Sequence, residues 1–157
     1  MTRVKIDMSG FKPIRKAWED RFKTRVGILG GKASESHKGT ELTNADIGAI
    51  HEFGSLSDNI PPRSFLRLPL EAKIGEWINK NRSRYMELME QGNVRKFYVG
   101  MGFAAKRIIN KAFVTSGFGQ WAQNKPETVK RKGSSKPLID TGQLRASITS
   151  RVMSDDK

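Results

Sequence analysis

Apolar residues recur with helical spacing in the middle of the chain. One stripe runs through residues 69–90 and a second through residues 94–113, with apolar positions three or four residues apart. Residues 91–93 (Gln-Gly-Asn) separate the stripes, because glycine adopts a left-handed conformation easily and asparagine can cap the following helix. The pattern predicts two antiparallel helices joined by a tight turn. At about 1.5 Å per residue each helix would be ~30 Å long, so we expect the pair to span the molecule.

Alternating apolar and polar residues predict strands outside this middle region. The alternation occurs at residues 3–8, 24–29 and 146–153. Between the first two strands, residues 12–23 carry one apolar helical face, with Pro13 in the first turn. The order β-α-β-α-α-α-β predicts an α+β fold in which the terminal strands share one small sheet.

The remaining segments predict a loop and short helices. Residues 32–42 are polar and rich in Ser, Lys and Gly, which is typical of a mobile loop. Asn44 can cap a short helix that ends at Gly54. Further on, Trp121 is the one large anchor of a loop-like stretch, and residues 126–132 suit a short helical turn. The apolar residues expected on the inner side of the first short helix are Ile47, Ile50 and Phe53.

The length fits one domain, and the charge is the unusual feature of the composition. The chain has 157 residues, so we expect a single domain over residues 1–157. No apolar run approaches the ~20 residues that a membrane span needs, and we expect no signal peptide in residues 1–10. The absence of cysteine excludes disulfides and Cys-based metal sites. The net charge of +13, from 29 Lys and Arg against 16 Asp and Glu, points to a polyanionic neighbour.

Patterns that would indicate catalysis or metal binding are incomplete. Residues 27–33 (GILGGKA) superficially resemble a phosphate-binding loop, but Val26 replaces the first glycine and Ala33 replaces the hydroxyl residue. His51-Glu52 lacks the second histidine of a metalloprotease helix. No Gly-x-Ser-x-Gly elbow occurs, although spacing alone leaves paired carboxylates open. We therefore expect no enzymatic activity, no cofactor and no metal site.

Two stretches of the sequence, taken together, resemble a known group of proteins. The first is residues 44–67 (NADIGAIHEFGSLSDNIPPRSFLR); the second is residues 138–152 (LIDTGQLRASITSRV), preceded by residues 119–121 (GQW). In this order they resemble the tail-completion and head–tail joining proteins of tailed bacteriophages, which are minor tail or neck proteins. The related virion-morphogenesis proteins of Mu-like phages share the likeness. Ser64 departs from the pattern, since a second proline is common there.

The resemblance implies a fold, a role and a location. The fold is α+β, with a small antiparallel or mixed sheet packed against a long helix or helical hairpin. The role is that of a structural protein that completes the tail or joins it to the head at the neck. The location is the virion, after assembly in the host cytoplasm. The partners are other neck and tail proteins in a ring, with no membrane, and no catalytic residues come with the family.

The first motif supplies one half of an expected subunit interface. Its prolines stiffen the chain, which lowers the entropy lost when the segment docks. An aromatic residue between two arginines can then seat in a neighbouring subunit. The alternative is that Phe65 fills the chain's own core, while the arginines cap helix ends or pair with Glu52. The expected interface residues of this motif are Phe53, Pro61, Pro62, Arg63, Phe65 and Arg67.

The second motif supplies the other half. Asp140 and Gln143 stand in capping-box spacing and predict the start of a short helix. This helix would carry Leu144 inward and present Arg145 to other subunits. The alternative is a purely local capping role. The expected interface residues of this motif are Asp140, Thr141, Gly142 and Arg145.

The densest basic cluster is a candidate to face packaged DNA. Its members are Lys125, Lys130, Arg131, Lys132 and Lys136. Contact with phosphates would be weak, blind to sequence and steeply dependent on salt. Alternatively, these residues meet acidic surfaces of neighbouring virion proteins or only aid solubility. The charge also leaves open an alternative function for the whole chain, that of a free, sequence-nonspecific nucleic-acid-binding protein.

Overall fold

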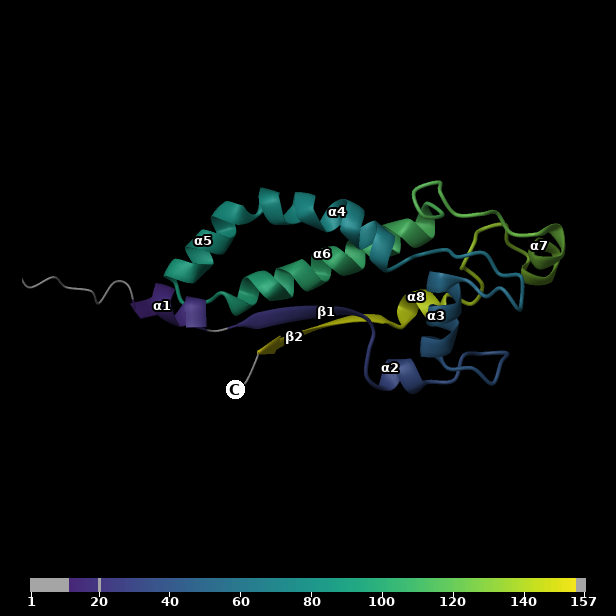
Figure 1. Ribbon diagram of the computed structural model, residues 1–157, viewed down its shortest axis with the longest axis horizontal. Coiled ribbons are helices and arrows are strands. Elements are labelled where there is room, and N and C mark those ends of the chain that lie inside the picture. The colour runs from purple at the N-terminus through teal and green to yellow at the C-terminus, as the bar shows by residue number, and fades with distance from the viewer. Residues whose placement is uncertain (1–11, 20, 155–157) are drawn as a thin grey trace, which may run out of the picture.

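The chain forms an elongated structure built along one long helix. The computed structural model describes residues 12–19 and 21–154. Figure 1 shows helices above the long helix, strands below it, and short helices gathered towards one end. The strand expected at residues 3–8 lies outside the described residues. The elements are α1 (Lys12–Glu19), β1 (Phe22–Ile28), α2 (Gly31–Ser34), α3 (Asn44–Phe53), α4 (Arg67–Lys80), α5 (Arg82–Glu90), α6 (Arg95–Val114), α7 (Pro126–Lys132), α8 (Gln143–Ala146) and β2 (Ile148–Ser154).

The strands β1 and β2 form a two-stranded antiparallel sheet that packs against α6. Ile28 lies opposite Ile148 in the register. The helix approaches the sheet closely at Gly102, where an added Cβ would lie 3.0 Å from Ser150 Oγ and 3.3 Å from Thr24 Cγ2. A side chain at this position would force the layers apart. The small antiparallel sheet on a long helix confirms the expected α+β fold class.

The two antiparallel helices expected in the middle of the chain are present, with one additional break. α6 covers the second stripe, but α4 and α5 divide the first at Asn81. Asn81 Nδ2 donates a hydrogen bond to Trp77 O at 2.8 Å, and such side-chain bonds compete with the helical ladder. The cap expected from Asn93 is wrong, since no side-chain hydrogen bond caps α6. A backbone hydrogen bond from Asn93 N to Leu88 O, 2.7 Å long, closes the turn instead.

Two hydrophobic clusters lie along α6. The larger contains Phe65, Ile109, Phe113 and Trp121, all buried. The ring centroids of Phe65 and Phe113 are 5.2 Å apart, and those of Phe113 and Trp121 are 5.9 Å apart. The burial of Trp121 confirms its expected role as an anchor. The smaller cluster, near the start of α6, is made of Met89 and Val94 with Phe22, Tyr85 and Tyr98 packed against them.

The segment between β1 and α4 has more structure than expected. Residues 32–42 include most of α2 and lead to a β-bridge at Thr43, so the expected loop is only partly correct. Thr43, and not Asn44, caps α3: its hydroxyl accepts from Asp46 N, and Asp46 Oδ2 accepts from Thr43 N, at 3.2 and 2.9 Å. Asn44 is instead fully buried. Gly54 ends α3 as expected, with φ of 81°.

The elements near the ends of the described chain match the expectations with shifted boundaries. The helix expected at residues 12–23 stops at Glu19, because Phe22 and Lys23 already pair with β2. The helical turn expected at residues 126–132 is α7. The strand expected at residues 146–153 begins at Ile148, after the single turn of α8. Within the described part of the chain, no helix is both long and apolar enough to cross a bilayer.

Candidate functional site

The first motif folds around a buried carboxylate. Glu52, at the end of α3, is 6% exposed. Its Oε2 accepts hydrogen bonds from Phe65 N and Leu66 N at 2.8 and 2.9 Å. Its Oε1 accepts from Arg67 N at 3.0 Å and from Ser64 Oγ at 2.6 Å. A carboxylate thereby satisfies the free amides at the start of α4, where the helix dipole favours negative charge.

A buried arginine ties the same motif to the segment after α6. Arg63 is 8% exposed, and its Nε and Nη2 donate to Ala122 O and Gln123 O at 2.9 and 3.1 Å. Its backbone N donates to His51 O at 2.7 Å. Trp121 Nε1 adds a third link by donating to Ser64 O at 3.2 Å. The first motif and the Gly-Gln-Trp segment are therefore one rigid frame.

Two of the expected interface residues are not at the surface. Phe65 has no exposed area and packs against Phe113, so the expectation that it docks in a neighbouring subunit is wrong for the folded chain. The alternative, that Phe65 fills the chain's own core, is confirmed. Arg63 is also wrong as a rim residue, because its guanidinium group is turned inward to backbone carbonyls and does not pair with Glu52. Burying the large aromatic ring of Phe65 in the chain's own core stabilises the fold, and the ring is then not accessible to another subunit.

The motif leaves a tight hairpin, residues 55–60, at the surface between α3 and the frame, with large apolar residues exposed in it and just before it. Ser55 and Ile60 exchange backbone hydrogen bonds of 2.9 and 2.8 Å across its base. At Gly54 an added Cβ would lie 2.9 Å from Ile60 O, so the chain folds back tightly there. Phe53 is 72% exposed and Leu56, at the tip, is fully exposed. Other exposed residues of the expected interface in this region are Pro61, Pro62 and Arg67.

The second motif folds differently from the expected capping box. Gly142, with φ of 80°, precedes α8, and Thr141 Oγ1 accepts a hydrogen bond from Gln143 N at 3.3 Å, but the side chains of Asp140 and Gln143 do not form the expected box. Gln143 instead reaches across the fold: its Nε2 donates to Ser36 O at 2.8 Å and to Asn44 Oδ1 at 3.1 Å. The motif therefore makes both a local contact, through Thr141, and distant contacts, through Gln143. Leu144 is buried at 3% exposure, as expected.

The remaining interface residues of the second motif lie at the surface. Asp140, Thr141 and Arg145 are exposed. Arg145 Nε donates to Asn110 Oδ1 at 2.9 Å, which connects α8 to α6. The outward direction expected for Arg145 is confirmed, while its contact with another subunit stays a prediction.

The two motifs meet at a cleft of about 260 Å³ between α3, α7 and α8. We call it the basic cleft. Only part of the expected DNA-facing cluster lines it, namely Arg131 and Lys132; Lys125, Lys130 and Lys136 are exposed outside its lining. The titratable residues that line the basic cleft are His37, His51, Arg63, Arg131, Lys132 and Asp140.

The basic cleft perturbs the groups that line it. Burial, together with the positive charges of Arg63 and Lys132 and with His37, lowers the pKa of His51 from 6.5 to about 4. Burial also lowers the pKa of Lys132, against the opposing effect of Asp140. The Nδ1 atom of His51 is buried and has no hydrogen-bond partner within the described part of the chain. The electrostatic potential in this cleft is therefore positive, and one polar atom in it is unsatisfied.

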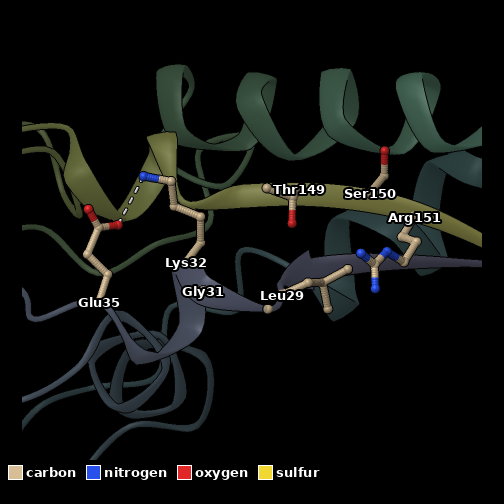
Figure 2. Close-up of a pocket in the computed structure, with 8 residues that line it drawn as sticks. Leu29, Gly31, Lys32, Glu35, Thr149, Ser150 and Arg151 are labelled. Carbon is tan, nitrogen blue, oxygen red and sulfur yellow. Dashed lines mark hydrogen bonds and ion pairs between the residues drawn. The ribbon is translucent and has the colours of Figure 1, made fainter.

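A second, larger hollow of about 690 Å³ lies where β1 turns into α2. Figure 2 shows Lys32 of α2 and Glu35, the residue after this helix, joined by an ion pair on one side and Thr149 and Arg151 of β2 on the other. The Lys32 Nζ to Glu35 Oε2 distance is 3.0 Å, and both side chains are about half exposed. Lys32 is thus paired at the surface and not directed into a phosphate cradle. Across residues 12–19 and 21–154, no cluster of three or more acidic or histidine side chains is arranged to hold a metal ion.

Sequence reasoning missed the polar residues that hold the site together. Asn44, Gly48 and Glu52 form the buried face of α3. Of the residues expected on the inner side of this helix, Ile47 packs against the larger core cluster and Ile50 is half-buried, but Phe53 is exposed, so the expectation is wrong for Phe53. The four-residue spacing of the buried positions was a usable signal, because residues four apart share one helix face. Amphipathic reasoning selects apolar residues for the interior and therefore passes over such a stripe. Comparison with known proteins finds no family model that matches the chain, and no curated protein or solved structure that is similar to it.

Proposed function

We propose that the chain is a structural subunit of a tailed-bacteriophage virion that completes the tail or joins it to the head at the neck. Two observations support the proposal. The two motifs resemble those of phage tail-completion and neck proteins, and the folded motifs leave large apolar side chains exposed beside a buried hydrogen-bonded frame. The chain acts through contacts with other neck and tail proteins and performs no catalysis. In this role, the motif residues build and position a docking surface.

The exposure of two large apolar residues, one at the end of α3 and one in the hairpin after it, is the observation that carries this proposal. Phe53 and Leu56 are 72% and 102% exposed, although each is large and apolar. Burying such a side chain in an interface contributes about 1.5–3 kcal/mol. The hairpin is closed by backbone hydrogen bonds and rests on the frame of Glu52 and Arg63, so little conformational entropy is lost on docking.

The test is assembly of phage particles with substitutions at the hairpin. Because both side chains are exposed, Leu56→Ser and Phe53→Ser should leave folding intact. In a phage that depends on this protein, we expect the double variant to accumulate separate heads and tails, visible by electron microscopy. Phe103→Ser is the matched control, because Phe103 is 62% exposed but lies on α6. Normal particle yields from a folded double variant would contradict the proposal.

A second candidate function, sequence-nonspecific binding of nucleic acid, is favoured by one feature of the sheet. Arg25 and Arg151 lie directly opposite each other and are exposed. They project from the face opposite the one that Thr24 and Ser150 turn towards α6, since neighbouring residues alternate. Like charges in opposed positions destabilise a sheet unless an anion approaches. Contact with packaged DNA inside a virion would serve both candidate functions.

A further inference from the structure

The basic cleft contains more positive charge than the described residues neutralise. Arg63, Arg131 and Lys132 face one carboxylate, that of Asp140. His51 stays neutral near pH 7, because its pKa is lowered to about 4. Two positive charges therefore remain without a counter-charge inside the cleft.

Arg63 makes this imbalance costly. Its side chain is buried, and its two assigned hydrogen bonds go to the neutral carbonyl groups of Ala122 and Gln123. No carboxylate lies within ion-pair distance of it in the described part of the chain. An arginine cannot shed its proton, so a buried guanidinium group is stabilised only by an anion or by further hydrogen bonds.

The cleft also holds donors for such an anion. His51 Nδ1 is buried without a partner, so one imidazole tautomer presents an N–H group for which the fold supplies no acceptor. Asn124, Thr128 and Thr141 add neutral polar groups to the lining. Unsatisfied donors and uncompensated cations in one cleft are complementary to an oxyanion.

We propose that the basic cleft is a binding site for a carboxylate group carried by an acidic segment of another polypeptide. The size of the cleft favours this occupant, because about 260 Å³ accommodates an acidic side chain and is small for a nucleotide. Its depth favours the same occupant, since Arg63 is only 8% exposed and a rigid duplex backbone does not reach a recessed guanidinium group. The site goes beyond the proposed virion role, and it is tested on the isolated chain.

The experiment measures binding of three probes by the purified, full-length protein. The probes are a blocked hexapeptide containing three glutamates, inorganic phosphate and a short DNA duplex. In two-dimensional NMR spectra at 0.15 M salt, we expect the glutamate peptide to shift the His51 imidazole and Arg63 side-chain resonances. The same peptide with glutamine in place of glutamate should leave both unchanged.

Substitutions on one helix separate the cleft from general electrostatics. Lys132→Gln should weaken peptide binding by roughly 10- to 150-fold, because it removes a charge-assisted hydrogen bond. Lys130→Gln is the matched control, since it removes the same charge from α7 at an exposed position outside the cleft. It should change affinity by less than about twofold. Asp140→Asn should strengthen binding, because it removes the one acid in the lining.

Three outcomes would overturn the proposal. One is that the glutamate peptide shifts neither the His51 nor the Arg63 resonances. Another is that Lys130→Gln weakens binding as much as Lys132→Gln, which would indicate diffuse attraction. The third is that phosphate or the duplex shifts these resonances while the peptide does not, which would make the ligand a phosphate. None of these depends on virion assembly, so the result stands apart from the test of the hairpin.

Discussion

At the scale of single residues, burial decides which motif positions are available to other molecules. Phe65 and Arg63 are adjacent to the exposed Pro61 and Pro62, yet both face inward. His51 shows what burial does to a titratable group: loss of solvent, followed by the positive charges of Arg63 and Lys132, lowers its pKa. Such a residue responds to acid in a measurable way.

His51 predicts a loss of stability in mild acid. Its pKa is about 4 in the folded chain against 6.5 for a free side chain, so the unfolded state binds the proton more readily. Neutral His51 leaves the folded state at its full stability above about pH 6.5. As pH falls towards 4, protons bind the unfolded state preferentially and the free energy of unfolding decreases. Urea unfolding measures the free energy of unfolding at pH 7 and at pH 4.5. The decrease between these two pH values should be smaller for His51→Gln than for the unaltered chain, by on the order of 2 kcal/mol. His37→Gln is the control, and an identical pH profile for His51→Gln would refute the assignment.

At the scale of elements, one carboxylate fixes the relation between α3 and α4. Glu52 belongs to the end of α3, yet it accepts from three consecutive backbone amides at the start of α4. The chain between them is thereby held as a closed loop, from which the hairpin projects. The position of Leu56 in the hairpin thus depends on the hydrogen bonds of Glu52, although Leu56 takes no part in them.

Glu52→Gln is expected to destabilise the fold by about 2–4 kcal/mol, because the amide offers one acceptor where the carboxylate offered two and turns an N–H group towards donors. Chemical denaturation monitored by circular dichroism measures the change. Glu71→Gln is the matched control: Glu71 pairs with Arg67 at 3.4 Å on the surface, and such pairs contribute at most about 1 kcal/mol. Equal losses from the two variants would show that Glu52 does not hold the elements together.

The sequence predicts elements well where one local rule dominates and poorly where distant groups compete. The stripe that forms α6 and the glycine that ends α3 follow from spacing and backbone freedom, and both are present. Asn44 and Gln143 also suit capping positions, but they bond to each other across the fold. Their partners lie about a hundred residues away, and no local pattern encodes that distance. The same limitation hid the basic cleft, whose lining comes from separate segments between His37 and Leu144.

At the scale of the whole molecule, two of the surfaces that carry basic groups lie apart from each other. One is the open face of the sheet, with Arg25 opposite Arg151. The other is the end formed by α7, which Figure 1 shows beyond α3 and α8. The first is a broad, exposed strip suited to a polyanion, whereas the second includes the recessed basic cleft. The elongated shape therefore separates two different kinds of electrostatic contact.

The sheet face predicts salt-dependent binding to duplex DNA. Affinity should fall steeply between roughly 50 and 200 mM salt, as released counterions require. The double variant Arg25→Gln, Arg151→Gln should reduce the slope of log affinity against log salt by about two. Arg82→Gln with Arg95→Gln is the control, because both are exposed at the first residues of α5 and α6, away from the sheet strands. Fluorescence anisotropy measures both, and equal slopes for the two double variants would exclude the sheet face.

The placement of two cores along a single helix has a consequence for how the protein opens. The smaller group, around Met89 and Val94, touches the first turns of α6, whereas the group around Phe65 and Phe113 touches its last turns. Packed units of this kind loosen with separate free energies. The end of the molecule formed by α1 and α5 can therefore unfold locally while the end around Phe65 and Phe113 stays folded. A subunit built in this way can deform at one end while the other end, which holds the two sequence motifs, keeps its structure.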